Sequence, residues 1–207
     1  MTIEKPVVSE KALTFDDIVD TVRRILAETL NVSEDAITPD AVLFDDLGAE
    51  SIDFIDIAIR VERTFGVKLP TRDWGAFARR ERGQLTMAEL ASLLEAHHGV
   101  RLSSEEQEAL GKFGLKPMCD RLQERYGIAI PQATRLDWAR RGMERHAKVF
   151  ETLFLQTLPA SDFERLVELA SEDAYSEAFT RALRRLFTVR VICQFLAASL
   201  SRERGEA

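Results

Sequence analysis

The organising stretch of this chain reads Asp46-Leu47-Gly48-Ala49-Glu50-Ser51-Ile52-Asp53-Phe54 and continues without a break to Phe65. Its second half predicts one amphipathic helix, because apolar residues recur at the three-and-four spacing of a buried helical face. We expect that buried face to contain Ile52, Ile55, Ile59 and the turn from Val61 to Phe65. The opposite side is expected to hold Asp53, Asp56, Arg60 and Arg63.

Ser51 falls where this helix begins, after the flexible pair Gly48-Ala49. A serine at a helix start usually has one of two roles. It caps the helix by accepting a backbone N–H bond, or it presents its hydroxyl to a group outside the chain. Capping is the more common role for an arbitrary serine, so the neighbouring residues must decide between the two.

Those neighbours resemble the acyl carrier protein family in motif and register. The family usually has Asp-Ser-Leu after Leu-Gly, and an acidic helix that ends in Phe-Gly-Val/Ile-x-Ile-Pro. Here the serine lies within Leu47–Asp53, and Phe65-Gly66-Val67-Lys68-Leu69-Pro70 follows fourteen positions after it. Glu50 stands where the family usually has aspartate, and Ile52 where it usually has leucine. Both residues keep the charge and shape of the usual ones, so we expect them to affect which partner enzymes bind more than whether the cofactor is attached.

The resemblance implies that Ser51 is an acceptor and not a catalyst. A phosphopantetheinyl transferase would attach 4′-phosphopantetheine from coenzyme A to it, and the thiol of this arm would carry acyl groups as thioesters. A phosphodiester suits a helix N-terminus, where N–H groups are unpaired and the dipole is positive. Acyl-transferring or condensing enzymes would then recognise the acidic residues around the serine, namely Asp46, Glu50, Asp53, Asp56 and Glu62.

The charge of the 207-residue chain is divided unevenly. Residues 1–100 hold 11 basic and 19 acidic side chains, and residues 101–207 hold 17 and 16. An acidic first half argues against nucleic acid as its partner, because phosphate backbones are bound by clustered Lys and Arg. No apolar stretch approaches the roughly 20 residues that span a bilayer. We interpret Cys119 and Cys193 as core residues, and expect a cytoplasmic protein without a secretory segment.

The pattern of the whole chain predicts an all-α protein with two domains. We expect a flexible leader at residues 1–13, a four-helix carrier domain at 14–99 and a second helical bundle at 103–202. Capping boxes at Thr14 and Thr86 open the first and last carrier helices, and a long loop between residues 32 and 50 delivers the serine. Glycines 66, 99, 114 and 127 each follow an aromatic residue or histidine, and we interpret all four as helix C-caps.

Residues 71–84 are an insertion relative to the family, with Trp74 and Phe77 among them. The insertion is either a short helix that closes the core or a lid or docking surface. Arg135, Arg140, Arg141, Arg145 and Lys148 give the long helix near residues 134–158 a basic side. That side is either a solvated face or a surface that receives the acidic half or a membrane.

The sequence shows no strong sign of a metal site or of an enzyme. His97 and His98 are adjacent and point to different sides of a helix, and His146 is remote from them. The prediction is therefore an acyl carrier for fatty acid, specialised lipid or polyketide synthesis. Its C-terminal domain would serve partner docking or assembly, through intramolecular or homo-oligomeric contact. The competing hypotheses are an unmodified helical scaffold, in which Ser51 only caps its helix, and a fused enzyme of unseen type.

Overall fold

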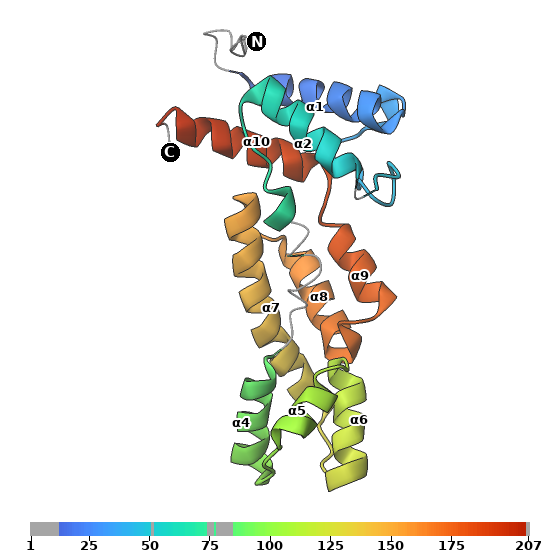
Figure 1. Cartoon of the computed structure of the whole chain (residues 1–207), viewed down its shortest axis with the longest axis vertical. Helices are drawn as coiled ribbons and strands as arrows, with labels where there is room; N and C mark the ends of the chain where they lie inside the picture. The colour runs from blue at the N-terminus through green and yellow to red at the C-terminus, as the bar shows by residue number, and fades with distance from the viewer. Residues whose placement is uncertain (1–12, 51, 74–76, 78–84, 206–207) are drawn as a thin grey trace. The chain divides into compact units, whose positions relative to one another are not determined.

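The computed structural model describes residues 13–50, 52–73, 77 and 85–205, and within these ranges the predicted all-α class is confirmed. The only pairing of extended backbone that the described residues show is an isolated bridge between Val42 and Thr188. Figure 1 shows the helices. Their bounds are α1 Phe15–Leu30, η1 Glu34–Ala36, α2 Asp53–Phe65, α4 Met87–His98, α5 Ser104–Leu110, α6 Leu115–Tyr126, α7 Gln132–Phe154, α8 Ala160–Asp173, α9 Glu177–Arg184 and α10 Val189–Glu203.

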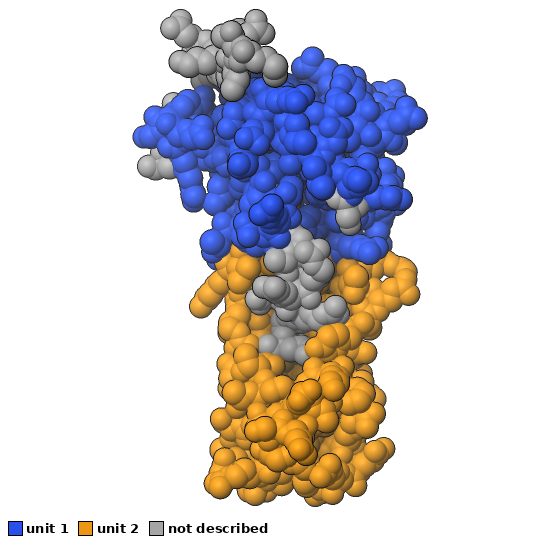
Figure 2. Space-filling view, viewed as in Figure 1, with its two compact units in different colours: residues 1–75, 151–156, 184–207 blue, residues 76–150, 157–183 orange. Residues whose placement is uncertain are grey.

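The chain divides into two compact units, coloured in Figure 2. Unit 1 consists of residues 1–75, 151–156 and 184–207, and unit 2 of residues 76–150 and 157–183. This division differs from the expected boundary between residues 99 and 103. Helix α4, expected to be the last carrier helix, lies in unit 2, and α10 lies in unit 1. In the sequence, unit 2 is therefore inserted between segments of unit 1 and does not simply follow it.

Unit 1 is built on α1, α2 and α10, which Figure 1 shows close together. Helix α1 begins as predicted, with Thr14 and Asp17 forming a reciprocal capping box, and ends at Asn31 in the left-handed conformation. Its buried face packs against both other helices, and α10 turns its own apolar residues inward. The buried side chains of these two helices are Ile18, Val22, Ile25 and Leu26 on α1, and Val189, Ile192, Cys193, Phe195 and Leu196 on α10. Packing against α10 thus helps to bury the apolar face of α1.

Unit 2 contains α4, α5, α6 and α8, together with most of α7 and α9. The predicted capping box at Thr86 and Glu89 opens α4. Contacts between α6 and α8 and between α4 and α5 hold the unit together. Its core is formed by large side chains that are almost fully buried, among them Phe77, Leu122, Met143, Phe150 and Phe179. Phe77 is therefore a core residue of unit 2, and Trp74 lies outside the described residues.

The glycine prediction is correct at three positions and wrong at the fourth. Gly66, Gly99 and Gly127 end α2, α4 and α6 in the left-handed conformation. Gly114 has φ −66° and is the N-cap of α6, so it begins a helix instead of ending one. Glycine is needed there for space, because a Cβ atom would lie 2.8 Å from the Cα of Asp173 at the end of α8.

Replacing Gly114 with alanine should therefore destabilise unit 2 by about 2 kcal/mol, the usual cost of overpacking against atoms that cannot move aside. Gly111→Ala is the matched control, because the nearest side-chain atom to its new Cβ would be the flexible Met87 Cγ at 3.1 Å. Urea unfolding of both variants measures the difference. Equal stability of the two variants would contradict the close approach at Gly114.

Candidate functional site

Ser51 lies outside the described residues, and the structure describes the residues on either side of it. Helix α2 begins at Asp53 with Ile52 as its N-cap, and no described side chain caps its first turn. Glu50 is exposed, and Ile52 is 71% exposed. The Asp53 carboxylate accepts a hydrogen bond from the Glu50 amide at 2.7 Å, which joins the loop to the helix across position 51. A large enzyme can therefore reach both residues that flank the predicted serine.

The loop before the helix is anchored by its own main chain. The amides of Asp46 and Leu47 donate to the Val42 carbonyl at 3.0 and 3.2 Å, and the Ala49 amide donates to the Leu43 carbonyl at 2.8 Å. Leu43, Leu47 and Ala49 are buried, while Gly48 has φ +68° and turns the chain between the last two. We call residues 39–50 the attachment loop. Its buried anchors give the residues before position 51 a defined path.

The predicted buried face of α2 is correct at Val61 and Phe65 and wrong at its three isoleucines. Ile52, Ile55 and Ile59 are 71%, 58% and 43% exposed, respectively. The core-facing residues of α2 are Ile57, Val61 and Phe65, and Phe54 is half-buried. Helix α2 has apolar residues on two sides, so both sets satisfy the helical spacing. The set exposed to solvent forms a stripe that begins next to position 51.

The five predicted recognition acids lie in or near this part of unit 1, with different surroundings. Asp46 accepts a hydrogen bond from the Val42 amide at 2.8 Å, and Asp53 from the Glu50 amide. Asp56 pairs with Arg60 Nε at 2.9 Å, and Arg60 also pairs with Glu28. Glu50 and Glu62 are exposed. The structure thus shows local bonding for Asp46, Asp53 and Asp56, and their role in recognition stays a prediction.

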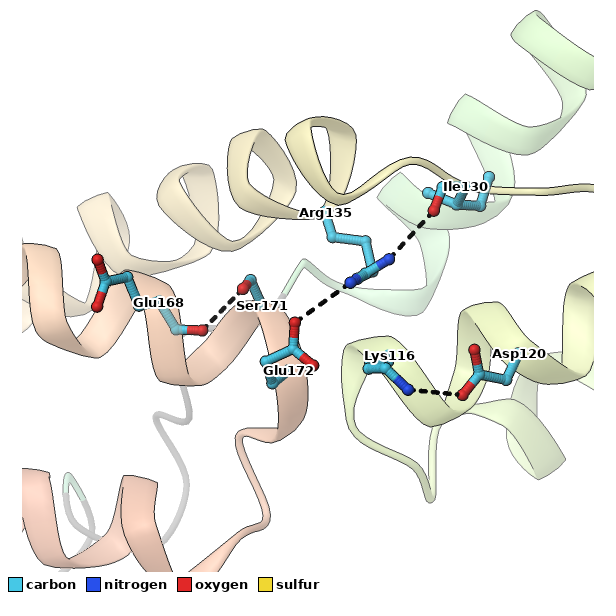
Figure 3. Close-up of polar contacts among 7 residues, drawn as sticks. All are labelled: Lys116, Asp120, Ile130, Arg135, Glu168, Ser171 and Glu172. Atoms are coloured by element: carbon cyan, nitrogen blue, oxygen red, sulfur yellow. Dashed lines mark hydrogen bonds and ion pairs between the residues drawn. The ribbon is translucent and has the colours of Figure 1, made fainter.

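The basic side of the long helix is occupied by intramolecular ion pairs. On α7, Arg135 pairs with Glu172, Arg140 with Glu164, Arg141 with Asp137 and Arg145 with Glu89. Figure 3 shows Arg135 between the Ile130 carbonyl and Glu172 of α8. Because these arginines already have carboxylate partners within unit 2, the structure favours the solvated face over a receiving surface.

The remaining candidates behave as core groups. Cys119 and Cys193 are buried as predicted, and burial raises the pKa of each thiol to about 12. His146 is fully buried, stacks on the Phe77 ring with centroids 4.0 Å apart, and burial lowers its pKa to about 4. No helix in the described part of the chain has the length and hydropathy of a membrane span.

Two residues near the site were missed by the sequence analysis. Phe187 contacts the rings of Phe44, in the attachment loop, and Phe54, in the first turn of α2, with centroids 5.7 and 6.5 Å away. Arg190 pairs with Asp40 at 2.9 Å. No local signal could have found either residue, because they lie more than a hundred positions from the loop in the sequence.

Comparison with known proteins finds a family match that covers the candidate site. The family described as phosphopantetheine attachment site matches residues 20–74, which contain α2, the attachment loop and position 51. Residues 20–74 belong to this family. The cofactor of such carrier segments is 4′-phosphopantetheine, held covalently.

Several curated relatives of this carrier segment are named acyl carrier protein AcpXL. The protein from Brucella melitensis is 43% identical over 61 residues, which is 30% of this chain and 61% of that protein. Those from Rhizobium etli and Mesorhizobium japonicum are 41% and 42% identical over 61 and 55 residues, covering 30% and 27% of this chain and 62% and 59% of the relatives. The chain thus spans about three fifths of the relatives' length, and no solved structure matches it.

Proposed function

We propose that this protein is an acyl carrier, in which Ser51 is the residue that receives 4′-phosphopantetheine. A phosphopantetheinyl transferase would join the serine oxygen to the arm's phosphate, displacing the nucleotide part of coenzyme A. The arm supplies the thiol on which acyl groups are held as thioesters. The described residues on either side of position 51 are exposed, and we expect them to present the attachment point to partner enzymes.

The family match over residues 20–74 is the observation that carries this proposal. The geometry around position 51 fits the cofactor. Both flanking residues are exposed, and the first turn of α2 has no side-chain cap among the described residues. The positive end of the helix dipole lies at Asp53, where α2 begins. Ser51 lies two positions before α2, and the other serine of the matched segment is Ser33.

We further propose that α2 is the surface on which acyl-transferring or condensing enzymes dock. The exposed isoleucine stripe of Ile52, Ile55 and Ile59 supplies apolar contact area, and Glu50 and Glu62 supply exposed negative charge. Apolar contacts give such an interface affinity, and long-range attraction between charges raises the encounter rate and weakens with salt. The pathway, the docking role of unit 2 and the oligomeric state stay predictions.

The proposal is tested by measuring mass after coexpression with a broad-specificity phosphopantetheinyl transferase. We expect the full chain to gain the mass of one phosphopantetheine arm and Ser51→Ala to gain none. Ser33→Ala, which alters another serine of the matched segment, is the control and should be modified like the wild type. An unmodified wild-type chain would support the unmodified scaffold instead.

A further inference from the structure

The attachment loop is held by a segment that lies far away in the sequence. We call Phe187–Arg190 the clasp. The main chains of the loop and the clasp run antiparallel at the Val42–Thr188 bridge. Three main-chain hydrogen bonds join them: Leu43 N to Phe187 O at 2.9 Å, Val189 N to Ala41 O at 3.1 Å, and Arg190 N to Pro39 O at 2.7 Å. The loop that leads to position 51 is therefore fixed along its first half by the start of α10.

One ion pair accompanies these bonds. Arg190 Nε donates to Asp40 Oδ1 at 2.9 Å, and this hydrogen bond lowers the pKa of the Asp40 carboxyl. Both side chains are well exposed, so solvent screens the attraction. The main-chain bonds and the ring packing carry more of the clasp's effect than this pair does.

The ring of Phe187 extends the clasp to both sides of position 51. Phe44 and Phe54 stack on each other with centroids 5.0 Å apart, and Phe187 meets both rings edge-on. Phe44 precedes position 51 and Phe54 follows it. Phe187 also meets Phe154, a residue of unit 1, with centroids 5.5 Å apart. Phe187 itself is buried, so one side chain supports both the loop and the helix start.

We infer that the clasp is a positioning element for the attachment serine, so that transfer of the arm depends on the start of α10. This inference rests on the proposed function. The transferase must bring the serine oxygen in line with the phosphate of coenzyme A, and small misplacements of a reacting group slow such steps strongly. A loop released from the clasp would spend less time in the geometry that the transferase accepts, while Ser51 itself stays unchanged.

The main-chain bond is tested by Val189→Pro and its control Val189→Ala. Val189 is the first residue of α10, a position where proline is well tolerated, and Thr188 already has the extended backbone that a following proline requires. Proline removes the N–H that bonds to Ala41, whereas alanine keeps it. Both variants lose some packing of the buried valine. Only the proline variant loses the hydrogen bond from residue 189 to the Ala41 carbonyl.

The ring contact is tested by Phe187→Leu and its control Phe179→Leu. Phe179 is also buried, but it lies on α9 in unit 2 and is not part of the clasp. The kcat/KM of phosphopantetheine transfer is measured on the full chains at a temperature where circular dichroism shows them folded. Hydrogen exchange of the Leu43 amide reports whether the clasp has opened.

We expect Val189→Pro and Phe187→Leu to lower kcat/KM about tenfold or more and to speed exchange at Leu43, with both controls close to wild type. Equal rates within each pair would overturn the inference while leaving the proposed function intact. A wild-type chain that takes up no arm would instead overturn the proposed function. If Phe187→Leu does not fold, the Val189 pair decides alone.

Discussion

A fragment of residues 1–99 is expected to remain largely unfolded, although it contains the whole segment that matches the carrier family. The fragment lacks α10, whose inward side chains include Val189, Ile192 and Leu196. The apolar face of α1 would then lose a packing partner. At about 1.5 to 3 kcal/mol for each large side chain that stays exposed, the loss approaches the 5 to 15 kcal/mol that stabilises an ordinary domain.

Far-UV circular dichroism and urea unfolding of the fragment measure this effect. The matched control joins residues 13–75 to residues 184–205 through a flexible glycine-serine linker, which restores α10 and removes unit 2 together with residues 151–156 of unit 1. We expect the joined chain to be the more helical per residue and to unfold cooperatively. If residues 1–99 unfold cooperatively and accept the arm, α4 can replace α10, and the expected boundary at residue 99 is right after all.

The contrast between α1 and α10 shows what the sequence could predict. Helix α1 has one apolar stripe and a local start signal at Thr14, so its bounds and its buried face follow from nearby residues. The pairing of α10 with α1, and of the clasp with the attachment loop, joins segments about 150 positions apart. No local pattern encodes such a pairing, and a single sequence offers no other signal for it.

The predictions for the isoleucines of α2 and for Gly114 were wrong for a different reason, which is that one local pattern can fit two structures. Helix α2 has apolar residues on two sides, and only tertiary packing selects the side with Val61 over the side with Ile55. Gly114 follows an aromatic residue, as the true C-cap glycines 66 and 127 do, but glycine is required there by the close approach of Asp173. The motif around Ser51 was specific enough to identify the family without any of these contacts.

Acidification should destabilise unit 2 through His146, by about 3 kcal/mol between pH 6.5 and pH 4. His146 is fully buried against Phe77, and neither ring nitrogen has a hydrogen-bond partner among the described residues. Burial lowers the pKa of His146 from 6.5 to about 4. Between these values the unfolded chain binds a proton that the folded chain does not, so stability falls as the pH falls. A difference of about 2.5 pKa units corresponds to roughly 3 kcal/mol.

His146→Leu removes the titrating ring and keeps an apolar side chain of similar size, so its stability should fall less over the same pH range. Urea unfolding is followed by the fluorescence of the buried Trp138, on the same helix, in chains that carry Trp74→Phe. His97→Gln is the control, because it removes an exposed histidine and keeps His146. The free energy of unfolding of wild type minus that of His146→Leu should therefore decrease by about 3 kcal/mol from pH 7 to pH 4. A difference that does not change with pH would mean that His146 is hydrated or charged in the folded chain, contrary to its burial against Phe77.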